Sequence, residues 1–295
     1  QNLDKLKMLK ASVIGLGNMG SGIAKNLHNS GFLLGAWNRS PERVKKIKEN
    51  YSLKIYDDLE DLVVHSKIII TSVSEDRDLN EIINKISPLL SEGSIILDTS
   101  TVSTQTAIDV GAHLASYKVS FLDGPVSGGK EGAHNGSLVM MAGGDSEILE
   151  KLSPLLRSFC SKIIHIGAIG SGQTTKAVNQ IMAAGINQSV TESLALAYAE
   201  NLDMERVVDA IGSGAAGNWF LNHRGNDMCN GNFEPGFKVS LHRKDLKICQ
   251  KIAEKHGLPS LLTNMTLNHY DELINQGFGD KDISILFTLK KKLFD

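Results

Sequence analysis

The sequence has few cysteines and no metal-binding pattern, and these absences exclude two kinds of protein. Its 295 residues include three cysteines, Cys160, Cys229 and Cys249, with no CxxC pair. An odd count without that spacing fits neither a disulfide framework nor a zinc site, and it indicates a reducing compartment. The nine histidines show no spacing such as HExxH. We therefore expect no metal cofactor.

The sequence also lacks an excess of either charge and lacks a long apolar run. Its 31 Lys and Arg residues nearly balance its 33 Asp and Glu residues, which leaves a formal net charge of −2. Such a chain is too neutral to bind nucleic acid through a basic surface. No apolar run reaches about 18 residues, so no segment is expected to span a membrane. We expect neither nucleic acid nor a membrane as a partner.

The first ten residues carry several lysines and no long apolar stretch. They lack the apolar region of a secretory signal peptide, while a transit peptide removed earlier stays open as an alternative. Together with the cysteine pattern, this favours a cytoplasmic protein, with the mitochondrial matrix as the alternative.

The first half of the chain alternates short β-rich runs with helical patterns. Helices are expected over 19–30 and 42–49, and strands over 11–14, 33–37, 68–73, 95–98, 120–122 and 139–142. Several strands are continuously apolar, as expected when helices cover both faces of a sheet. This alternation predicts an α/β domain with a Rossmann-type, doubly wound sheet.

After about residue 172 the pattern becomes helical. The run over 175–200 has no proline, and a stripe at helical spacing consists of Met182, Ile186, Val190, Leu194 and Ala197. About 26 residues of helix span roughly 39 Å, enough to connect two lobes. Further helices are expected over 204–211, 219–229, 241–256, 261–274 and 282–289. The sequence therefore predicts two domains, an α/β domain over 1–172 and an all-α domain over 173–295, joined by a long helix.

A glycine-rich turn directly follows the first predicted strand and opens the next helix. It consists of Gly15, Leu16, Gly17, Asn18, Met19 and Gly20. In such a GxGxxG turn the first glycine allows the tight turn, the second lets a pyrophosphate approach the backbone, and the third lets helix pack on strand. Free N–H groups of the helix N-terminus then face the phosphates. The motif predicts a bound dinucleotide; a turn that binds nothing is the alternative.

The end of the second predicted strand indicates which dinucleotide is bound. It carries Asn38, Arg39 and Ser40, where NAD-specific sites usually place Asp or Glu against the ribose 2′-hydroxyl. A guanidinium pairs with a 2′-phosphate, and a serine hydroxyl can donate to it. We therefore favour NADP(H) over NAD(H). The alternative for Arg39 is a solvated loop residue.

Four segments in order resemble the β-hydroxyacid dehydrogenases, which include 3-hydroxyisobutyrate dehydrogenase, tartronate semialdehyde reductase and the glyoxylate and succinic semialdehyde reductases. The segments are residues 15–20, Asp123 to Gly129 (DGPVSGG), Gly170-Ser171-Gly172 followed by Lys176, and Lys244-Asp245-Leu246. The resemblance runs from about residue 11 to the end of the chain. It implies a Rossmann-type domain and a helical C-terminal domain for substrate binding and dimerisation. It also implies a homodimer or homotetramer.

The segment over 123–129 leaves a predicted strand at the carboxyl edge of the sheet. Its glycines permit unusual dihedral angles, and successive backbone N–H groups can form a nest for an anion such as a carboxylate. The resemblance assigns substrate binding to Ser127, Gly128 and Gly129. The alternative is a glycine-rich turn without a ligand.

Lys176 is expected in the first turn of the long helix, where a cation opposes the helix dipole. A cation at that position lowers the stability of the helix, so a role as a general acid or base is a better reason for its presence. The resemblance makes Lys176 catalytic: it would protonate the carbonyl oxygen in reduction or accept the hydroxyl proton in oxidation. The alternative is a solvated lysine whose stem covers apolar surface.

The resemblance implies further binding residues. Against the cofactor it places Val73 and Ser74 at the end of the strand over 68–73, Thr101 after the next strand, and Lys244. Against the substrate it places Asn179 or Gln180, which can share a helix face with Lys176, and also Trp219, Phe237 and Asp245. From the residues alone, helix capping explains Ser74 and Thr101, and a solvated helix face explains Lys244. A structural role also explains the two amides and the two aromatic residues.

These features predict an NADP(H)-preferring oxidoreductase of small β-hydroxyacids and the corresponding carboxylated aldehydes. Glyoxylate and the succinic, tartronate and methylmalonate semialdehydes are not separated by the sequence. One alternative is an imine reductase, which shares this architecture and a similar Trp-Asn-Arg-Ser strand end but generally lacks the lysine and the Ser-Gly-Gly loop. Another is a catalytically silent cofactor-binding module, against which the presence of Lys176 argues.

Overall fold

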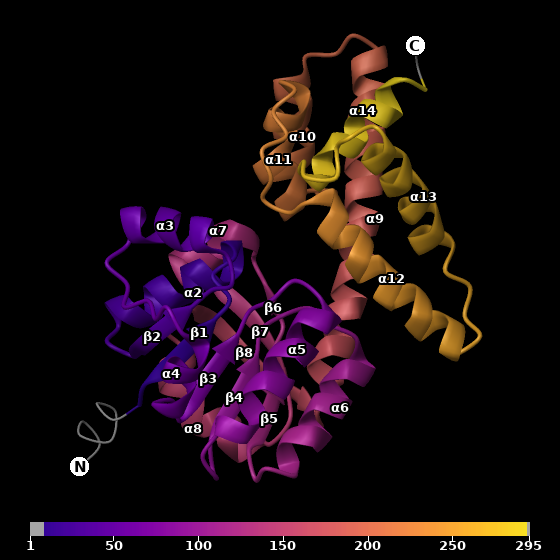
Figure 1. Cartoon of the computed structure of the whole chain (residues 1–295). Helices are drawn as coiled ribbons and strands as arrows, with labels where there is room; N and C mark the ends of the chain where they lie inside the picture. Colours follow the sequence, from indigo (N-terminus) through magenta and orange to yellow (C-terminus); the bar gives the residue numbers. More distant parts are fainter. Residues whose placement is uncertain (1–8, 294–295) are drawn as a thin grey trace. The chain divides into compact units, whose positions relative to one another are not determined.

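A computed structural model describes residues 9–293, and the chain forms two compact units that divide after Lys176. The first unit contains a mainly parallel sheet covered by helices, and the second is helical (Figure 1). The predicted fold class, α/β followed by all-α, is confirmed. The division falls four residues beyond the predicted position at residue 172.

The sheet of the first unit has eight strands in the order β2-β1-β3-β4-β5-β7-β6, with β8 paired to β7. The strands are β1 Ala11–Ile14, β2 Leu33–Trp37, β3 Ile68–Thr71, β4 Ile95–Asp98, β5 Ser120–Asp123, β6 Val126–Ser127, β7 Leu138–Gly143 and β8 Cys160–Gly167. The run from β2 to β5 is parallel, whereas β7 is antiparallel to β5 and β6. The sequence prediction omitted β6, which has two residues, and β8, in which exposed and polar residues dilute the apolar pattern.

Helices cover both faces of this sheet. They are α2 Asn18–Asn29, α3 Pro41–Asn50, α4 Leu59–Val64, α5 Asp76–Ile86, α6 Thr104–Ala115, α7 Gly129–Asn135 and α8 Ser146–Leu156. Buried residues of α2, α7 and α8 share one core cluster, and those of α4, α5 and α6 share the other.

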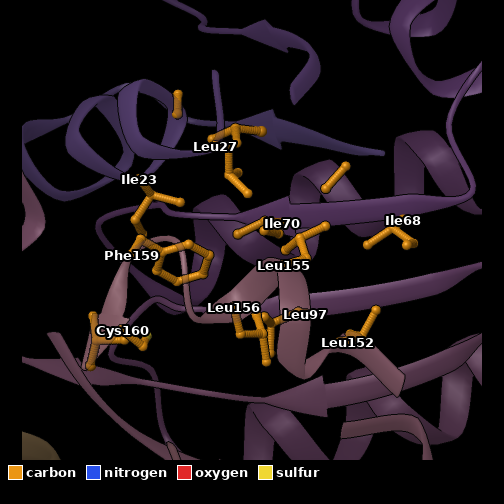
Figure 2. Packing of buried hydrophobic residues seen from close by; sticks show 14 of the residues in the cluster. Ile23, Leu27, Ile68, Ile70, Leu97, Leu152, Leu155, Leu156, Phe159 and Cys160 are labelled. Atoms are coloured by element: carbon orange, nitrogen blue, oxygen red, sulfur yellow. The ribbon is translucent and has the colours of Figure 1, made fainter. Parts of the chain in front are cut away.

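Alternation along the strands divides the side chains between the two clusters. In β3, Ile68 and Ile70 point into the cluster that contains Ile23 of α2 and Leu155 of α8, as Figure 2 shows. Ile69 points to the opposite face. Each fully buried side chain of this kind contributes about 1.5–3 kcal/mol to folding. Burial on both faces explains why these strands are continuously apolar.

The order of the strands places a ligand crevice at one point of the sheet. The chain leaves β1 for its neighbour β2 and then returns to β3 on the other side of β1. In doubly wound sheets, ligands bind outside the carboxyl ends of the strands where the winding reverses. The loops that follow β1 and β3 therefore border the expected cofactor crevice.

The long helix α9, Ser171–Ala199, begins in the first unit and continues into the second. The other helices of the second unit are α10 Met204–Gly212, α11 Trp219–Cys229, α12 Val239–Lys255, α13 Leu261–Asn275 and α14 Leu286–Lys291. The prediction of one helix over 282–289 was wrong at its start, because Asp282 caps a short 3-10 turn over Ile283–Ile285 before α14. Among residues 9–293, every helix is too short or too polar to traverse a lipid bilayer.

The predicted start of α9 was also wrong, and so was the place of Lys176 in its first turn. The helix begins at Ser171 instead of residue 175, so Lys176 is its sixth residue and lies beyond the first turn. Of the stripe at helical spacing, Val190, Leu194 and Ala197 are buried, whereas Met182 is 64% exposed. The three cysteines are free thiols.

Candidate active site

The first feature of the site is the glycine-rich turn between β1 and α2. Gly15 has a φ of +95°, and a Cβ built on it would lie 2.1 Å from the carbonyl oxygen of Ser72. A Cβ on Gly20 would lie 2.0 Å from the carbonyl oxygen of Gly15. At Gly17, by contrast, a Cβ would meet no protein atom within 4 Å. The turn therefore packs closely against the loop after β3 and is open where α2 begins, as a pyrophosphate-binding backbone requires.

Asn38, which follows β2, and Arg43 of α3 hold this turn in place. The Asn38 Oδ1 atom accepts a hydrogen bond from the Leu16 N–H at 2.8 Å. Arg43 donates from Nε to the Leu16 carbonyl at 2.9 Å and from Nη2 to Asn18 Oδ1 at 2.7 Å. The Leu16 side chain is buried in the core, and Met19 packs against the same cluster. The turn is thus fixed through both its backbone and its side chains.

Sequence reasoning missed Arg43. It is the third residue of α3, so its cation lies in the first turn, where it opposes the helix dipole. A cation in the first turn of a predicted helix is the sequence signal that pointed to Lys176, which the structure places outside the first turn. The same signal is present in α3 and identifies Arg43.

Arg39 lies at the end of β2 and has acidic neighbours on α5. Its Nη1 atom lies 3.2 Å from Asp78 Oδ1 and 3.8 Å from Glu81 Oε2, while its side chain is 72% exposed. The next residue, Ser40, caps α3 by accepting from the Arg43 N–H at 3.4 Å. Arg39 is thus an exposed, ion-paired residue, which agrees with the alternative of a solvated loop residue, and a phosphate bound by it would compete with two carboxylates.

The loops after β3 and β4 carry three more of the predicted cofactor-side residues. Because β3 ends at Thr71, Val73 and Ser74 lie in the loop, and their placement at the end of a strand was wrong. The physical reason is that the Val73 N–H donates to Ser100 Oγ at 2.8 Å instead of to a neighbouring strand. Thr101 follows Ser100 and is half-buried.

The segment after β5 contains the predicted substrate loop. Ser127 is half-buried in β6, which pairs with β7. Gly128 and Gly129 have φ angles of +133° and +64°, in the region that favours glycine. These angles fit the unusual backbone expected for a segment whose N–H groups gather around an anion.

Asp123 at the end of β5 determines where α9 begins. Its Oδ1 atom accepts from the Gly170 N–H at 2.7 Å, and its Oδ2 atom accepts from the Gln173 N–H at 2.9 Å. Burial raises the pKa of Asp123 above its usual value, and these backbone donors oppose that rise. The buried carboxylate satisfies N–H groups that a helix start otherwise leaves unpaired, so the helix begins before residue 175.

Replacing Asp123 by alanine is expected to destabilise the first unit. The change removes two buried hydrogen bonds to a carboxylate, and each contributes about 1.5–3 kcal/mol. Because the burial of the carboxylate offsets part of this gain, we expect the free energy of unfolding in urea to fall by about 2–4 kcal/mol. Asp145→Ala is a comparison, because Asp145 caps α8 at an exposed position. An Asp123 variant no less stable than the Asp145 variant would contradict this account.

Lys176 is buried, with 8% of its surface exposed, although it is a lysine. Its Nζ atom donates to the Val126 carbonyl oxygen at 3.0 Å. The ammonium group is therefore held beside the segment that contains Ser127, Gly128 and Gly129. The alternative of a solvated lysine is excluded by this burial.

In the second unit, α9 and α12 bring together four of the predicted residues. Gln180 Nε2 donates to Asp245 Oδ2 at 2.7 Å, and Asp245 Oδ1 lies 3.1 Å from Lys244 Nζ. Asn179 donates to Gln180 Oε1 at 2.9 Å. The Lys244 side chain is 22% exposed, so it is not part of a solvated helix face.

The two predicted aromatic residues have different surroundings. Trp219 is 51% exposed, stacks on His223 at 4.2 Å between ring centroids, and does not belong to the core. Phe237 is half-buried against a core cluster and lies 5.1 Å from the His242 ring. The alternative of a structural role in the core is therefore wrong for Trp219, whereas Phe237 does pack against the core.

The glycine turn between β1 and α2, together with the reversal of the sheet winding at β1, defines an α/β domain of the class that binds dinucleotides. Comparison with known proteins agrees with this class. Residues 10–167 match a model of the NAD binding domain of 6-phosphogluconate dehydrogenase. Residues 170–289 match a model described as NAD-binding of NADP-dependent 3-hydroxyisobutyrate dehydrogenase. The chain belongs to the β-hydroxyacid dehydrogenase family and is an NAD(P)-dependent hydroxyacid dehydrogenase.

Individual relatives match along nearly their whole length. The chain is 37% identical over 282 residues to the uncharacterized oxidoreductase YkwC of Bacillus subtilis (strain 168), covering 94% of this chain and 96% of the relative. It is 28% identical over 298 residues to the NAD-dependent L-serine dehydrogenase of Pseudomonas aeruginosa, covering 98% of each. The solved structure of Mycobacterium tuberculosis 3-hydroxyisobutyrate dehydrogenase with L-serine has a TM-score of 0.84 at 25% identity, covering 96% of this chain and 99% of that chain.

Proposed function

We propose that this chain is an NADP(H)-preferring enzyme that interconverts small β-hydroxyacids and the corresponding carboxylated aldehydes, with Lys176 as general acid and base. The observation that carries the proposal is the buried Lys176 ammonium, held at 3.0 Å from the Val126 carbonyl beside the Ser127–Gly129 loop. A buried cation next to an anion-binding backbone can hold both the carboxylate and the reacting oxygen of a small acid.

In this mechanism the bound nicotinamide supplies or accepts the hydride. The Ser127 hydroxyl and the backbone N–H groups around Gly128 and Gly129 would bind the substrate carboxylate; the two glycines have positive φ angles that other residues rarely adopt. In reduction, Lys176 would give a proton from Nζ to the carbonyl oxygen; in oxidation it would take the proton of the hydroxyl. The Val126 carbonyl orients Nζ for this transfer.

The second unit supplies further candidates for substrate binding. Gln180 is held by Asp245, and it follows Lys176 by four positions on α9. Residues four apart lie on the same side of a helix. Gln180 and Asn179 thus form an amide pair one turn along α9 from the proposed acid. By resemblance to the family, we also propose Asp245, Phe237 and Trp219 for the substrate and Lys244 for the cofactor.

One matched family model is described as NADP-dependent and one relative as NAD-dependent. The cofactor preference proposed for this chain therefore rests on its own residues. Asn38, Arg39 and Ser40 put no carboxylate at the end of β2 where a ribose 2′-hydroxyl would be held. Arg39 and Arg43 provide two guanidinium groups at this edge. The absence of a carboxylate and the presence of these guanidinium groups both favour a 2′-phosphate.

The proposed reaction is tested by steady-state oxidation of NADPH and NADH with glyoxylate and with the succinic, tartronate and methylmalonate semialdehydes. Turnover of at least one of them with a higher kcat/KM for NADPH supports the proposal. Binding of the cofactor without turnover of any carboxylated aldehyde would contradict the proposed substrate class. In that case cyclic imines are the next substrates to assay.

We also propose that the enzyme is a homo-oligomer whose subunits pair through the second unit. Val178 and Met182 of α9 and Leu261 and Met265 of α13 are exposed apolar residues, and Leu261 is 80% exposed. The two helices contact each other, since Gln188 donates to Thr266 at 3.1 Å. Large exposed apolar patches mark interaction surfaces, and a second copy of the chain is the occupant we propose.

The double substitution Met182→Glu and Leu261→Glu is expected to shift the protein to a smaller species. Two carboxylates would be buried without partners in the paired state, which disfavours association by at least about a hundredfold. Light scattering after size-exclusion chromatography at micromolar concentration measures the change. Val64→Glu is the matched control, because Val64 is an exposed apolar residue of the first unit. An unchanged mass of the double variant would reject this surface.

A further inference from the structure

Asp98 is a buried carboxylate to which the reaction assigns no role. It is the last residue of β4 and has no exposed surface. Its Oδ1 atom accepts from Thr71 Oγ1 at 2.7 Å and from Ser100 Oγ at 2.6 Å. Its Oδ2 atom is buried and has no hydrogen-bond partner. One oxygen of the carboxylate thus receives two hydroxyl donors while the other is unsatisfied.

Ser100 connects Asp98 to the loop after β3 through two hydrogen bonds. Its hydroxyl donates to Asp98 and accepts from the Val73 N–H at 2.8 Å. A serine hydroxyl has a single hydrogen. Because Asp98 takes that hydrogen, the oxygen of Ser100 is turned toward Val73 as an acceptor. Asp98 therefore determines how the loop after β3 is held.

That loop borders the cofactor crevice. Ser72, which precedes Val73, is the residue against which Gly15 of the glycine-rich turn packs. A dinucleotide lies across the point where the sheet winding reverses, with its two halves over the two sides of the sheet. The adenosine half then belongs to the β2 side, where Asn38 and Arg39 lie. The nicotinamide half belongs to the β3 and β4 side, where the Val73 loop is fixed.

The charge on Asp98 is unfavourable for folding, which argues against a purely structural role. Burial raises its pKa from 3.8 to about 6, and the carboxyl of Asp123 on β5, which faces it, adds to the rise. An acid whose pKa is raised in the folded state lowers the stability at pH values above that pKa, because the unfolded chain ionises more easily. A group that costs stability at neutral pH is typical of a functional position.

We propose that Asp98 is a positioning residue that acts through Ser100 to fix the Val73–Ser74 loop against the nicotinamide half of the cofactor. The proposal rests on the hydride-transfer function proposed above and adds a residue that the reaction does not itself require. It does not depend on which aldehyde is reduced or on the preference for NADPH.

The test compares whole cofactors with the adenosine half alone. In Asp98→Asn, the Kd values for NADPH and NADH, measured by the fluorescence of the bound nicotinamide, are expected to rise roughly tenfold, because the amide oxygen of asparagine accepts from Ser100 without a negative charge and holds its hydroxyl less strongly. The Kd values for 2′,5′-ADP and 5′-ADP, measured by calorimetry, are expected to change by less than about twofold. The urea midpoint is expected to be no lower than that of the unsubstituted protein, because the buried charge is gone.

Two further variants make the result decisive. Ser100→Ala removes the acceptor for the Val73 N–H without changing Asp98, so it is expected to reproduce the loss of dinucleotide affinity even if Asp98→Asn fails to fold. Ser94→Ala is the control, since Ser94 is a buried residue without a side-chain partner just before β4. Equal weakening of dinucleotide and adenosine half, or unchanged dinucleotide binding in Ser100→Ala, would overturn the proposal. Failure of the proposed function would look different: the unsubstituted protein would bind NADPH or NADH and reduce no aldehyde.

Discussion

Lys176→Ala is expected to lower kcat by about 10²- to 10⁴-fold while the Kd for NADPH changes by less than about threefold. The reason is that Lys176 is placed to transfer the proton and has no proposed contact with the adenosine half of the cofactor. Stopped-flow hydride transfer and nicotinamide fluorescence measure the two quantities separately. A proportional loss of both would show that the change had disturbed the fold instead.

Lys176→Arg separates proton transfer from charge. Arginine keeps the positive charge, but it does not release its proton in proteins. We expect this variant to remain at least about a hundredfold slower than the unsubstituted enzyme. Lys251→Ala on the exposed side of α12 serves as the matched control and should turn over normally. Turnover by Lys176→Ala equal to that of the control would remove Lys176 from the mechanism.

Arg39→Ala is expected to weaken NADPH binding by about 10- to 100-fold and to change NADH binding by less than about threefold. This range corresponds to the loss of a charge-assisted contact with the 2′-phosphate, which only NADPH carries. The ratio of kcat/KM for the two cofactors measures the effect. Arg206→Ala, which changes a solvated arginine of the second unit, is the matched control.

The acidic neighbours of Arg39 allow a second test of the same contact. Asp78→Asn and Glu81→Gln remove the carboxylates that lie 3.2 Å and 3.8 Å from its guanidinium. Because those carboxylates compete with a phosphate, we expect either change to tighten NADPH binding by about two- to fivefold at low salt. If Arg39→Ala lowered the affinities for NADPH and NADH equally, the 2′-phosphate assignment would be wrong.

The local sequence is sufficient to predict the elements and the type of fold. Continuous apolar runs identified most strands of the sheet, because burial on both faces leaves no polar positions in them. The glycine turn and the 123–129 segment were also predictable, since positive φ angles and close backbone approach restrict those positions to glycine. Lys176 was found for a partly wrong reason: its burial supports the assignment, while the dipole argument does not apply to it.

The start of α9 shows where prediction from local pattern stops. The helical periodicity pointed to residue 175, but the helix begins at Ser171 because Asp123, about 50 residues earlier, accepts its first N–H groups. The same holds for Met182, whose exposure depends on which helices pack around α9. Capping by a distant side chain and packing between helices cannot be predicted from the residues of the helix itself.

The α/β and all-α architecture, the glycine turn for a dinucleotide, and the candidate lysine and substrate loop follow from local sequence patterns. Three other contacts are visible only in the folded chain: Arg39 meets Asp78, Arg43 holds the turn, and Ser100 contacts both Asp98 and Val73. Those between separate segments join residues from 25 to 39 positions apart. They exist because the order β2-β1-β3-β4 brings the carboxyl ends of neighbouring strands to one edge. That order is set by the packing of the whole sheet, which no single segment encodes.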